Sequence, residues 1–215
     1  MIKIEKTEVM GWKASIRGMR NPLESWDKSD SHWQSYLTGS MQNPVDFEWV
    51  LGANDLELMQ KLAKAGTDES KFARMIVVYA DITAPLYWWL EHDTYKVGTV
   101  ANSCSKMHKI HAKELTLDDF STEHLNSLSI CSLAEQIKLL NINRRDFVKS
   151  GNKDFWWQMI QMLPESYNQK RTVMLNYQVL WNMYQARKNH KLDEWKEFCK
   201  WVETLPHFMD IFVNQ

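Results

Sequence analysis

The stretch Met75-Ile76-Val77-Val78-Tyr79-Ala80-Asp81-Ile82 has the strongest strand character in the chain. Its β-branched and aromatic residues suit a half-buried strand, and Pro85 marks where that strand ends. A proline is tolerated at the first position of a helix, because the N–H that it lacks would have no partner there. The sequence therefore predicts a strand that leads directly into a helix beginning Leu86-Tyr87-Trp88-Trp89-Leu90.

Upstream of this strand the residue pattern changes twice. Residues 1–16 alternate apolar and polar side chains, which predicts one or two short strands. The candidates for their buried face are Ile2, Ile4, Val9 and Ile16. Residues 18–44 are rich in Gly, Pro, Asn, Asp and Ser, so we expect a long, partly ordered loop. A helix is predicted over residues 56–65, with Gly66 as its stop.

Downstream of residue 111 helical patterns dominate. Thr122 or Ser121 is expected to cap a helix that runs to residue 140. Three further helices are predicted over residues 155–163, 167–188 and 192–204. A chain of 215 residues can bury a substantial core as one unit. We therefore expect a single α+β domain over residues 1–215, with a helix-rich C-terminal half.

Composition limits the possible partners and compartments. The chain has 26 basic and 27 acidic residues, so its net charge of -1 gives no general attraction to nucleic acid or to an anionic membrane. It holds no apolar stretch of signal-peptide or membrane-span length. The 3 cysteines include no C-x-x-C pair, which favours free thiols in the reducing cytoplasm. The predicted protein is cytoplasmic and binds neither nucleic acid nor membrane.

Two blocks of sequence resemble the flavin-dependent thymidylate synthase family. The first is Gly66-Thr67-Asp68-Glu69-Ser70-Lys71-Phe72, followed by the strand, Ala84-Pro85 and the aromatic helix. The family order there is Gly-His-x-Ser-Pro-Phe, strand, Ala-Pro and aromatic helix. The family signature Arg-His-Arg-x-x-Ser then falls on Thr94-Tyr95-Lys96-Val97-Gly98-Thr99. Lys96 keeps a positive charge there, and Thr99 keeps a hydroxyl.

The second block lies in the C-terminal third. The family pattern of Leu-Pro followed by Asn-x-Arg falls on Leu163-Pro164 and Asn176-Tyr177-Gln178. It continues in register to Asn182 and Arg187. The resemblance implies that the two asparagines contact the flavin and that Arg187 contacts the deoxyuridylate substrate.

The chain departs from the family at several basic positions. The family histidine of the first block is Thr67 or Asp68, the phosphate-side arginine is Ile160, and the arginine of Asn-x-Arg is Gln178. A dianionic phosphate needs several charge-assisted donors, each worth about 1.5–3 kcal/mol. These losses predict weaker binding of ordinary deoxyuridylate.

The resemblance implies a fold, an activity and an assembly. The fold would be a mostly antiparallel sheet flanked by helices. The activity would be reductive methylation of deoxyuridylate or a related pyrimidine nucleotide, with reduced FAD as cofactor and methylenetetrahydrofolate and NADPH as co-substrates. The assembly would be a homotetramer with shared active sites. Two alternatives stay open: a non-catalytic relative that binds flavin or nucleotide, and a structural or partner-binding protein of the same fold.

The resemblance also implies a set of site residues. The residues expected to bind the cofactor are Ser70, Thr94, Tyr95, Lys96, Asn176 and Asn182. Those expected to bind the substrate are Glu91, Thr99, Cys104, Lys106 and Arg187, with Arg187 also the catalytic candidate.

Several of these residues have a plainer interpretation from the sequence alone. Asn176 and Arg187 would share one face of the helix predicted over 167–188, which is also the pattern of a solvated polar stripe. His92 suits an acid or base near neutral pH, and equally an exposed helix end.

Cys104 also has two interpretations. It could be a nucleophile if Lys106 or His108 lowered its pKa, or an unreactive side chain in a pocket wall. Cys104, His108 and His111 have no evident fourth ligand at a zinc-like spacing, so we predict no metal site.

Overall fold

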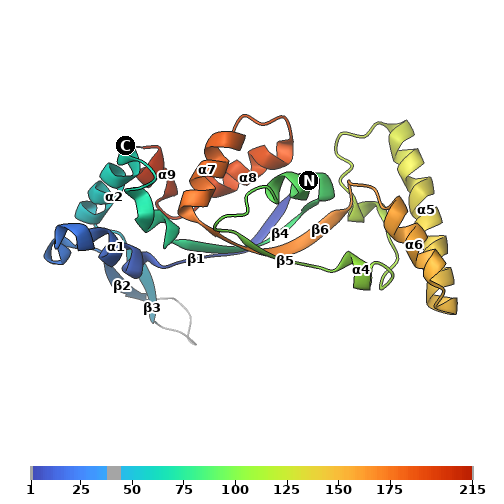
Figure 1. Ribbon diagram of the computed structural model, residues 1–215, viewed down its shortest axis with the longest axis horizontal. Helices are drawn as coiled ribbons and strands as arrows, with labels where there is room; N and C mark the ends of the chain where they lie inside the picture. Colours follow the sequence, from blue (N-terminus) through green and yellow to red (C-terminus); the bar gives the residue numbers. More distant parts are fainter. Residues whose placement is uncertain (1, 38–44, 215) are drawn as a thin grey trace. The chain divides into compact units, whose positions relative to one another are not determined.

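The computed structural model describes residues 2–37 and 45–214 (Figure 1). One sheet has the strand order β1-β4-β6-β5, and its members are Lys3–Met10 (β1), Val77–Pro85 (β4), Val100–Ser103 (β5) and Asn168–Asn176 (β6). β5 pairs with β6 in the antiparallel sense, with Val100 opposite Met174. The helices are Trp12–Arg20 (α1), Ala53–Ala65 (α2), Leu86–His92 (α3), Lys106–Lys109 (α4), Ser127–Ser150 (α5), Lys153–Met162 (α6), Tyr177–Arg187 (α7), Asp193–Glu203 (α8) and Phe208–Phe212 (α9). The predicted α+β class, an antiparallel sheet with helices, is confirmed.

The chain divides into two compact units. Unit 1 comprises Met1–Thr7, Tyr79–Met174 and Arg187–Cys199, and unit 2 comprises Glu8–Val78, Leu175–Ala186 and Lys200–Gln215. Strands β1, β4 and β6 and helices α7 and α8 contribute residues to both units. The organisation of residues 1–215 as one domain stays a prediction.

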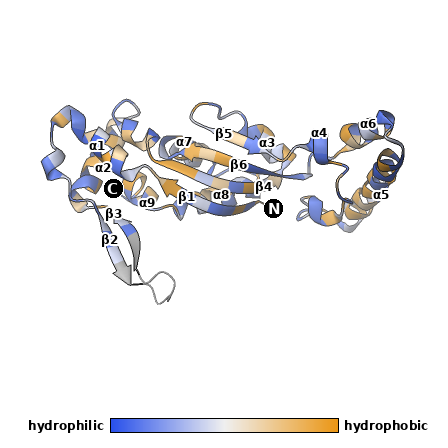
Figure 2. Ribbon diagram, turned by 90° about the horizontal axis from the view of Figure 1, so that it is seen from below, coloured by the Kyte–Doolittle hydropathy of each residue, from blue (hydrophilic) through white to orange (hydrophobic). Residues whose placement is uncertain are grey.

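Unit 1 has two groups of buried apolar side chains. Trp88 of α3 contacts Trp195 and Phe198 of α8, with ring centroids 4.8 and 5.7 Å apart. The second group lies between α5 and α6, which are amphipathic and show both hydropathy colours in Figure 2. Its buried members are Ile110, Leu115, Phe120, Leu133, Ile137, Leu140 and Met159. The first group holds α3, and with it Glu91, His92 and the start of the signature segment, in place.

Unit 2 contains a hairpin, helices α1, α2 and α9, and parts of α7 and α8. β2 (His32–Leu37) pairs with β3 (Val45–Val50) in the antiparallel sense, in a separate two-stranded sheet. The Trp12 ring packs edge-on against Tyr177 at 5.5 Å and against His207 at 5.6 Å. Gly11, just before α1, has a φ of 99°, and a Cβ there would lie 2.1 Å from the Met75 carbonyl oxygen. Only glycine fits at that position, because a side chain would meet backbone.

Three predictions about secondary structure were wrong. The strand pattern of residues 1–16 holds only through Met10, because Trp12, Ile16 and Met19 are buried at helical spacing on α1. The predicted loop over 18–44 contains the end of α1, 3-10 turns at 21–23 and 26–28, and β2; residues 38–44 lie outside the described part. The helix predicted over 167–188 is strand β6 followed by α7.

The other predicted helices are observed to within a few residues of their expected bounds, except at the start and end of α5, whereas α4 and α9 were not predicted. The side chain of Asn126, rather than Thr122 or Ser121, caps α5 by accepting the Ser129 N–H at 2.9 Å. α5 continues past residue 140 to Ser150 and ends at Gly151, which has a φ of 69°. Within the described residues, no helix has the length and apolar character needed to cross a membrane.

Candidate functional site

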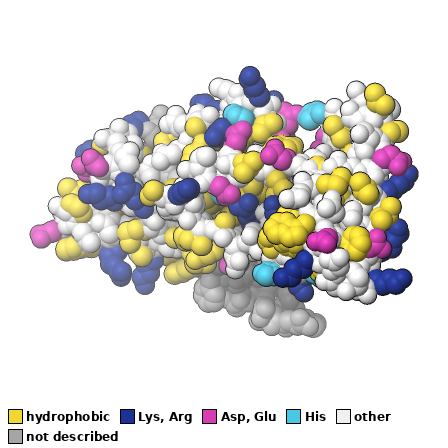
Figure 3. Space-filling view, turned by 45° about the vertical axis from the view of Figure 1, so that its right-hand side comes forward, with side chains coloured by type: hydrophobic (Ala, Val, Ile, Leu, Met, Phe, Trp, Pro, Cys, Tyr) yellow, Lys and Arg dark blue, Asp and Glu magenta, His cyan; other side chains and the backbone are white. Residues whose placement is uncertain are grey.

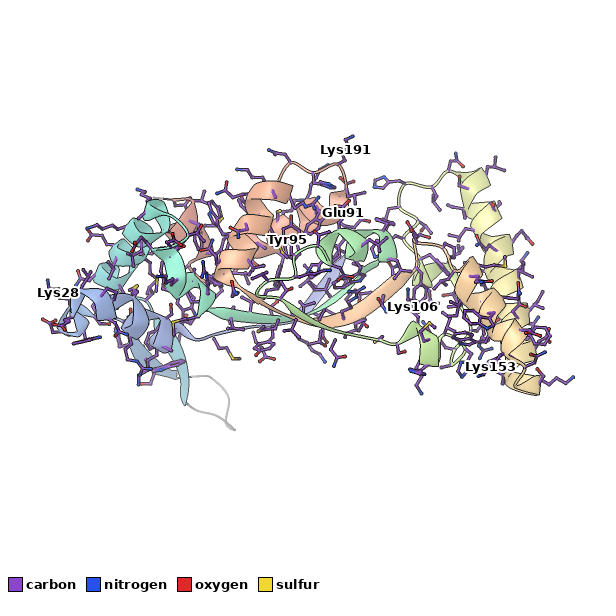
Figure 4. The ribbon with its side chains drawn as sticks, viewed as in Figure 1. Lys28, Glu91, Tyr95, Lys106, Lys153 and Lys191 are labelled. Atoms are coloured by element: carbon purple, nitrogen blue, oxygen red, sulfur yellow. The ribbon has the colours of Figure 1, made fainter. Side chains whose placement is uncertain are left out.

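Glu91, near the end of α3, is the centre of a polar cluster in unit 1. Its carboxylate accepts hydrogen bonds from Arg187 Nη1 and from the Trp195 indole N–H, both at 2.8 Å. His190 Nε2 lies 3.4 Å from the same oxygen. Arg187 Nε also donates to the Tyr95 hydroxyl at 2.9 Å. Glu91 and Tyr95 are labelled in Figure 4. The structure therefore brings together three of the predicted site residues, Glu91, Tyr95 and Arg187.

The guanidinium of Arg187 is held on several sides within this cluster. It lies 4.8 Å from the centroid of Trp195 and 5.6 Å from that of Tyr95. The side chain of Arg187 is 20% exposed and that of Glu91 35% exposed, so the ion pair is open to solvent on one side. Tyr95 and Glu91 engage Nε and Nη1 of Arg187, so an anion that comes to Arg187 would meet Nη2 and would compete with the carboxylate of Glu91 for the charge of the guanidinium.

The signature segment that follows α3 makes mostly internal contacts. The Thr94 hydroxyl donates to the Glu91 carbonyl at 2.7 Å, and the Thr99 hydroxyl donates to the Tyr95 carbonyl. Both threonines therefore hold the turn after the helix. Lys96 is exposed, and the described residues provide it with no carboxylate partner. Lys96 is thus the residue of this segment with a charge available to an anion.

A cavity of about 530 Å³ in unit 1 contains two more predicted site residues, Cys104 and Lys106. Its lining includes four lysines, Lys106, Lys109, Lys113 and Lys170, and two aspartates, Asp118 and Asp119. Lys113 pairs with Asp119, and Lys170 Nζ lies 2.9 Å from Asp81. No carboxylate among the described residues pairs with Lys106 or Lys109. This cavity, which we call the lysine cavity, therefore has two cations available to a ligand, Lys106 and Lys109.

Lys106 is half-buried in this cavity. Burial lowers the pKa of its ammonium, and the neighbouring positive charge of Arg171 lowers that pKa further. Both effects destabilise the charged form, so an anion beside Lys106 would relieve them. Lys106 lies on α4, away from Glu91 and Tyr95 (Figure 4).

His92 is neither an exposed helix end nor a ready acid or base at neutral pH, so both interpretations of it were wrong. Its side chain is buried against Trp88 and Trp89, with ring centroids 5.1 Å away in each case. Burial lowers its pKa to about 4, even though Asp93 lies 3.9 Å away. Neither ring nitrogen has a hydrogen-bond partner among the described residues. His92 is therefore a neutral core residue at pH 7.

The remaining predicted site residues lie in unit 2. The Ser70 hydroxyl donates to Gln178 Oε1 at 2.6 Å, and Gln178 Nε2 donates to Asn182 Oδ1 at 3.2 Å. Ser70 and Gln178 are buried, while Asn182 is exposed. Asn176 is the last residue of β6, and its side chain accepts the Val179 N–H at 3.0 Å. It caps α7, so the prediction that Asn176 and Arg187 share a helix face was wrong.

Cys104, His108 and His111 do not form a metal site. The Ser105 hydroxyl caps α4 by accepting the His108 N–H, and the His111 ring packs on Phe147 at 4.9 Å. Across residues 2–37 and 45–214, no group of three His, Cys, Asp or Glu side chains could hold a metal ion. Cys104 is exposed in the cavity wall.

Three contributors to the site were missed at the sequence level. Trp195 and His190 hold Glu91, and Arg171 donates to Asp93 at 2.7 Å while it lies 4.2 Å from the Trp89 centroid. The pattern of residues 192–204 predicted a helix there, but it did not indicate that Trp195 would contact Glu91. Arg171 fell in a segment wrongly predicted as helix, so no pattern could place it beside α3.

On the face of the protein that Figure 3 shows, basic and acidic side chains are interspersed. Anion binding must therefore come from local groups such as those of the lysine cavity, in agreement with the net charge of -1.

The comparisons with known proteins relate the chain to one fold. No protein-family model matches the sequence, and no curated protein matches it. One similar solved structure is thymidylate synthase X from Helicobacter pylori with FAD and dUMP, which is 16% identical with a TM-score of 0.67 over 100% of this chain and 98% of that chain. A second is flavin-dependent thymidylate synthase from the same organism, complexed with FAD and dUMP, at 15% identity, a TM-score of 0.66 and coverage of 99% and 98%. At this identity the likeness establishes the fold.

Proposed function

We propose that this chain binds FAD and a pyrimidine nucleotide, and that it methylates the nucleotide reductively with methylenetetrahydrofolate and NADPH. The half-buried Lys106, in a cavity with cations in excess, carries the proposal. Support also comes from the fold, since the similar Helicobacter enzyme was solved with FAD and dUMP.

The lysine cavity suits the phosphate of a nucleotide. A dianionic phosphate beside Lys106 and Lys109 would offset the repulsion between the positive charges of Lys106 and Arg171. Each charge-assisted hydrogen bond of this kind contributes about 1.5–3 kcal/mol. Lysine offers a point charge without the planar fork of arginine, so the orientation of the nucleotide must come from other side chains.

The residues expected to hold the flavin fit it in part. Asn182 is exposed and uses Oδ1 for its bond to Gln178, so its amide N–H groups can donate to a ligand. Lys96 offers a positive charge for a pyrophosphate. Ser70, Asn176 and Thr94 instead make internal hydrogen bonds. When bound, the flavin would supply the hydride, and Asn182 would bind and orient it.

Arg187 is the residue we assign to orienting the substrate in an active site shared between subunits, because Lys106 of the same chain lies away from the cluster of Glu91 and Tyr95 that holds Arg187. Nε and Nη1 of Arg187 are engaged by Tyr95 and Glu91, and no described residue accepts a hydrogen bond from Nη2, so Nη2 can donate to a ligand oxygen. An anionic oxygen of the nucleotide would then compete with the carboxylate of Glu91 for the charge of the guanidinium.

A second candidate function is nucleotide or flavin binding without methylation. The specific observation in its favour is the Arg187–Glu91 pair, which neutralises the proposed catalytic arginine. Gln178 supports it too, because a neutral amide stands where the family carries an arginine.

The family resemblance adds an assembly and a compartment to the proposal. We expect a homotetramer with active sites shared between subunits. Free thiols at Cys104, Cys131 and Cys199 favour the cytoplasm.

Calorimetric titration with dUMP tests the carrying observation. Wild type is expected to bind dUMP, and Lys106→Ala is expected to weaken binding by roughly tenfold or more, because one charge-assisted contact is lost. Lys149→Ala removes an exposed lysine of α5 outside the cavity and should bind like wild type. If Lys106→Ala and wild type bound dUMP with equal affinity, the proposal that the phosphate binds in this cavity would be wrong.

Flavin binding and turnover separate the two candidate functions. Purified protein titrated with FAD should shift the flavin absorbance bands, and Asn182→Ala should reduce that shift while Asn189→Ala, an exposed asparagine nearby in sequence, should not. Release of tritium from dUMP labelled at carbon 5 then reports methylation. Binding of FAD and dUMP without tritium release would favour the non-catalytic function. If the protein bound neither FAD nor dUMP, both candidate functions would be refuted.

A further inference from the structure

A second cavity, of about 400 Å³, lies entirely within unit 2. It is lined by residues of α1, of the 3-10 turn at Trp26–Lys28 and of the β2–β3 hairpin. Three tryptophans and four basic side chains line it, and no carboxylate from the described part of the chain does so. It shares no residue with the Ser70, Gln178 and Asn182 cluster of the same unit. None of the residues discussed for FAD or dUMP belongs to it.

Tryptophan side chains form the walls of this cavity, which we call the tryptophan cavity. Trp33 of β2 and Trp49 of β3 are directly opposite each other in the hairpin, with ring centroids 5.3 Å apart at 73°. Trp33 is 59% exposed and Trp26 is 51% exposed. Such exposed indoles offer ring faces on which a flat ligand can stack. The indole N–H of Trp49 is buried and has no acceptor among the described residues, so a ligand acceptor could satisfy it.

One face of α1 supplies the positive charge. Lys13, Arg17 and Arg20 are spaced i, i+4 and i+7, so they project on the same side of the helix. Lys13 and Arg17 are exposed, and no carboxylate of the described residues pairs with either. Their charges are available to a ligand, and His32 adds an imidazole ring to the lining.

Arg20 has a different role, because its guanidinium is buried and fully engaged. It donates from Nε to Asp55 at 2.6 Å, and from Nη1 and Nη2 to the carbonyls of Ser25 and Lys28, each at 3.2 Å. Burial acts to raise the pKa of Asp55, but hydrogen bonds from Ser31, Ser29 and Arg20 outweigh it and hold that pKa below its ordinary value. This network ties the turn that carries Trp26 to α1 and α2. The wall of the cavity is therefore fixed before any ligand binds.

We propose that the tryptophan cavity binds a small planar heteroaromatic anion of nucleotide size. The ring would stack on Trp33 or Trp26, and the anionic group would pair with Lys13 and Arg17. A volume of about 400 Å³ lies within the ~300–1,000 Å³ typical of small-ligand pockets. A long single-stranded nucleic acid fits less well, because the net charge of -1 gives no general attraction to its phosphate backbone.

Titration with adenosine 5′-monophosphate (AMP) tests the proposal, because AMP combines an aromatic ring with a phosphate. Wild type is expected to bind AMP at least tenfold more tightly than it binds adenosine or ribose 5-phosphate, which each lack one half of the recognition. Trp33→Ala and Arg17→Ala are each expected to weaken AMP binding by about tenfold, the loss expected for one stacked base or one charged contact. Both residues are exposed, so circular dichroism of the variants should match that of wild type.

Matched controls identify the cavity as the place of binding. Trp157→Ala removes a tryptophan of α6 that is 47% exposed, and Lys64→Ala removes an exposed lysine of α2; neither should change AMP affinity. Arg17→Glu, which reverses the charge, should abolish binding even if Trp33→Ala loosens the hairpin. AMP binding that survives Lys106→Ala separates this cavity from the proposed nucleotide site, so either proposal can fail alone.

Three outcomes would overturn the inference. These are the absence of saturable AMP binding, AMP binding that is unchanged in both Trp33→Ala and Arg17→Glu, and binding of a ten-nucleotide oligodeoxyadenylate more than a hundredfold tighter than that of AMP. The last result would identify single-stranded nucleic acid as the ligand.

Discussion

At the scale of single residues, the ion pair with Glu91 determines how strongly Arg187 can attract an anionic ligand. The Nη1 and Nε groups of Arg187 donate to Glu91 and Tyr95, and Trp195 holds the same carboxylate oxygen. The resemblance predicted that Glu91 and Arg187 both serve the substrate, but the sequence could not show that they pair. Residues 96 positions apart in the chain meet only because α3 and the end of α7 converge.

Replacement of Glu91 by glutamine is expected to strengthen nucleotide binding. Glutamine keeps an oxygen that accepts the Trp195 N–H, but it removes the negative charge that competes for Arg187. Calorimetry with dUMP should show affinity roughly threefold to tenfold above wild type, a modest gain because the pair is partly exposed to solvent. The double variant Glu91→Gln/Arg187→Ala should lose this gain. Weaker binding by Glu91→Gln would instead assign Glu91 a direct contact with the nucleotide.

His92 makes the stability of the protein depend on pH. Its pKa is about 4 in the folded protein, against 6.5 in its unperturbed form. Between these values the unfolded chain binds more protons than the folded one, so stability is lost as pH falls from 6.5 toward 4. The difference corresponds to about 3 kcal/mol in all.

The replacement His92→Phe isolates this contribution. Urea unfolding at pH 7.5 and pH 5.0 should show that wild type loses about 2 kcal/mol more than the variant over that interval. Asp93 and Arg171 are the charged groups nearest to His92, and both are present in the variant. His108→Gln, at an exposed histidine, should behave like wild type. If the free energy of unfolding changed equally with pH in wild type and in His92→Phe, His92 would be charged at pH 5.0 in the folded core, which would contradict the prediction.

At the scale of elements, β6 shows why part of the fold escaped prediction. Its residues Asn168 to Asn176 include polar side chains on both faces, and buried positions such as Gln169 are not apolar. Because Gln169 is satisfied by the Cys104 carbonyl at 2.7 Å, a polar residue can occupy an inward position of the strand. Periodicity finds strands by apolar alternation, so it extended the next helix backward across β6. β4 was found because its buried face is apolar.

Replacement of Asn176 tests whether this residue serves as a helix cap or as a contact with the flavin. Asn176→Ala is expected to destabilise the protein by about 1 kcal/mol, because the start of α7 loses a hydrogen-bond acceptor. Asn176→Ser should restore most of this stability, since serine also caps helices. If FAD affinity follows the same order as stability, the role of Asn176 is structural. A loss of FAD affinity in Asn176→Ser at full stability would support the direct flavin contact that the resemblance implies.

At the scale of the whole molecule, spacing in the sequence predicted the fold better than the chemistry of the site. The register of Leu163-Pro164, Asn176, Asn182 and Arg187 indicated a fold that full-length likeness to two solved structures supports. The hairpin of unit 2 had no counterpart in that register, and its tryptophans could not be placed. Site roles depend on side-chain partners from distant segments, which spacing alone does not report.

The assembly predicted by the resemblance can be measured directly. Analytical ultracentrifugation is expected to give about four times the 25.5 kDa mass of one chain. Exposed apolar side chains on α5, with Leu128 at 80% and Val148 at 61% exposure, are consistent with surfaces that become covered in an assembly. A species with the mass of one chain at micromolar concentration would contradict the homotetramer.

The three cysteines differ in exposure, so their rates of alkylation can report on ligand binding. Cys104 lines the lysine cavity and is exposed, Cys131 is exposed on α5 outside that cavity, and Cys199 is buried. A maleimide should therefore alkylate the first two in the native protein and spare the third until it unfolds. A nucleotide in the lysine cavity should protect Cys104 and leave Cys131 as an internal standard, so peptide mass spectrometry can follow occupancy without any mutation.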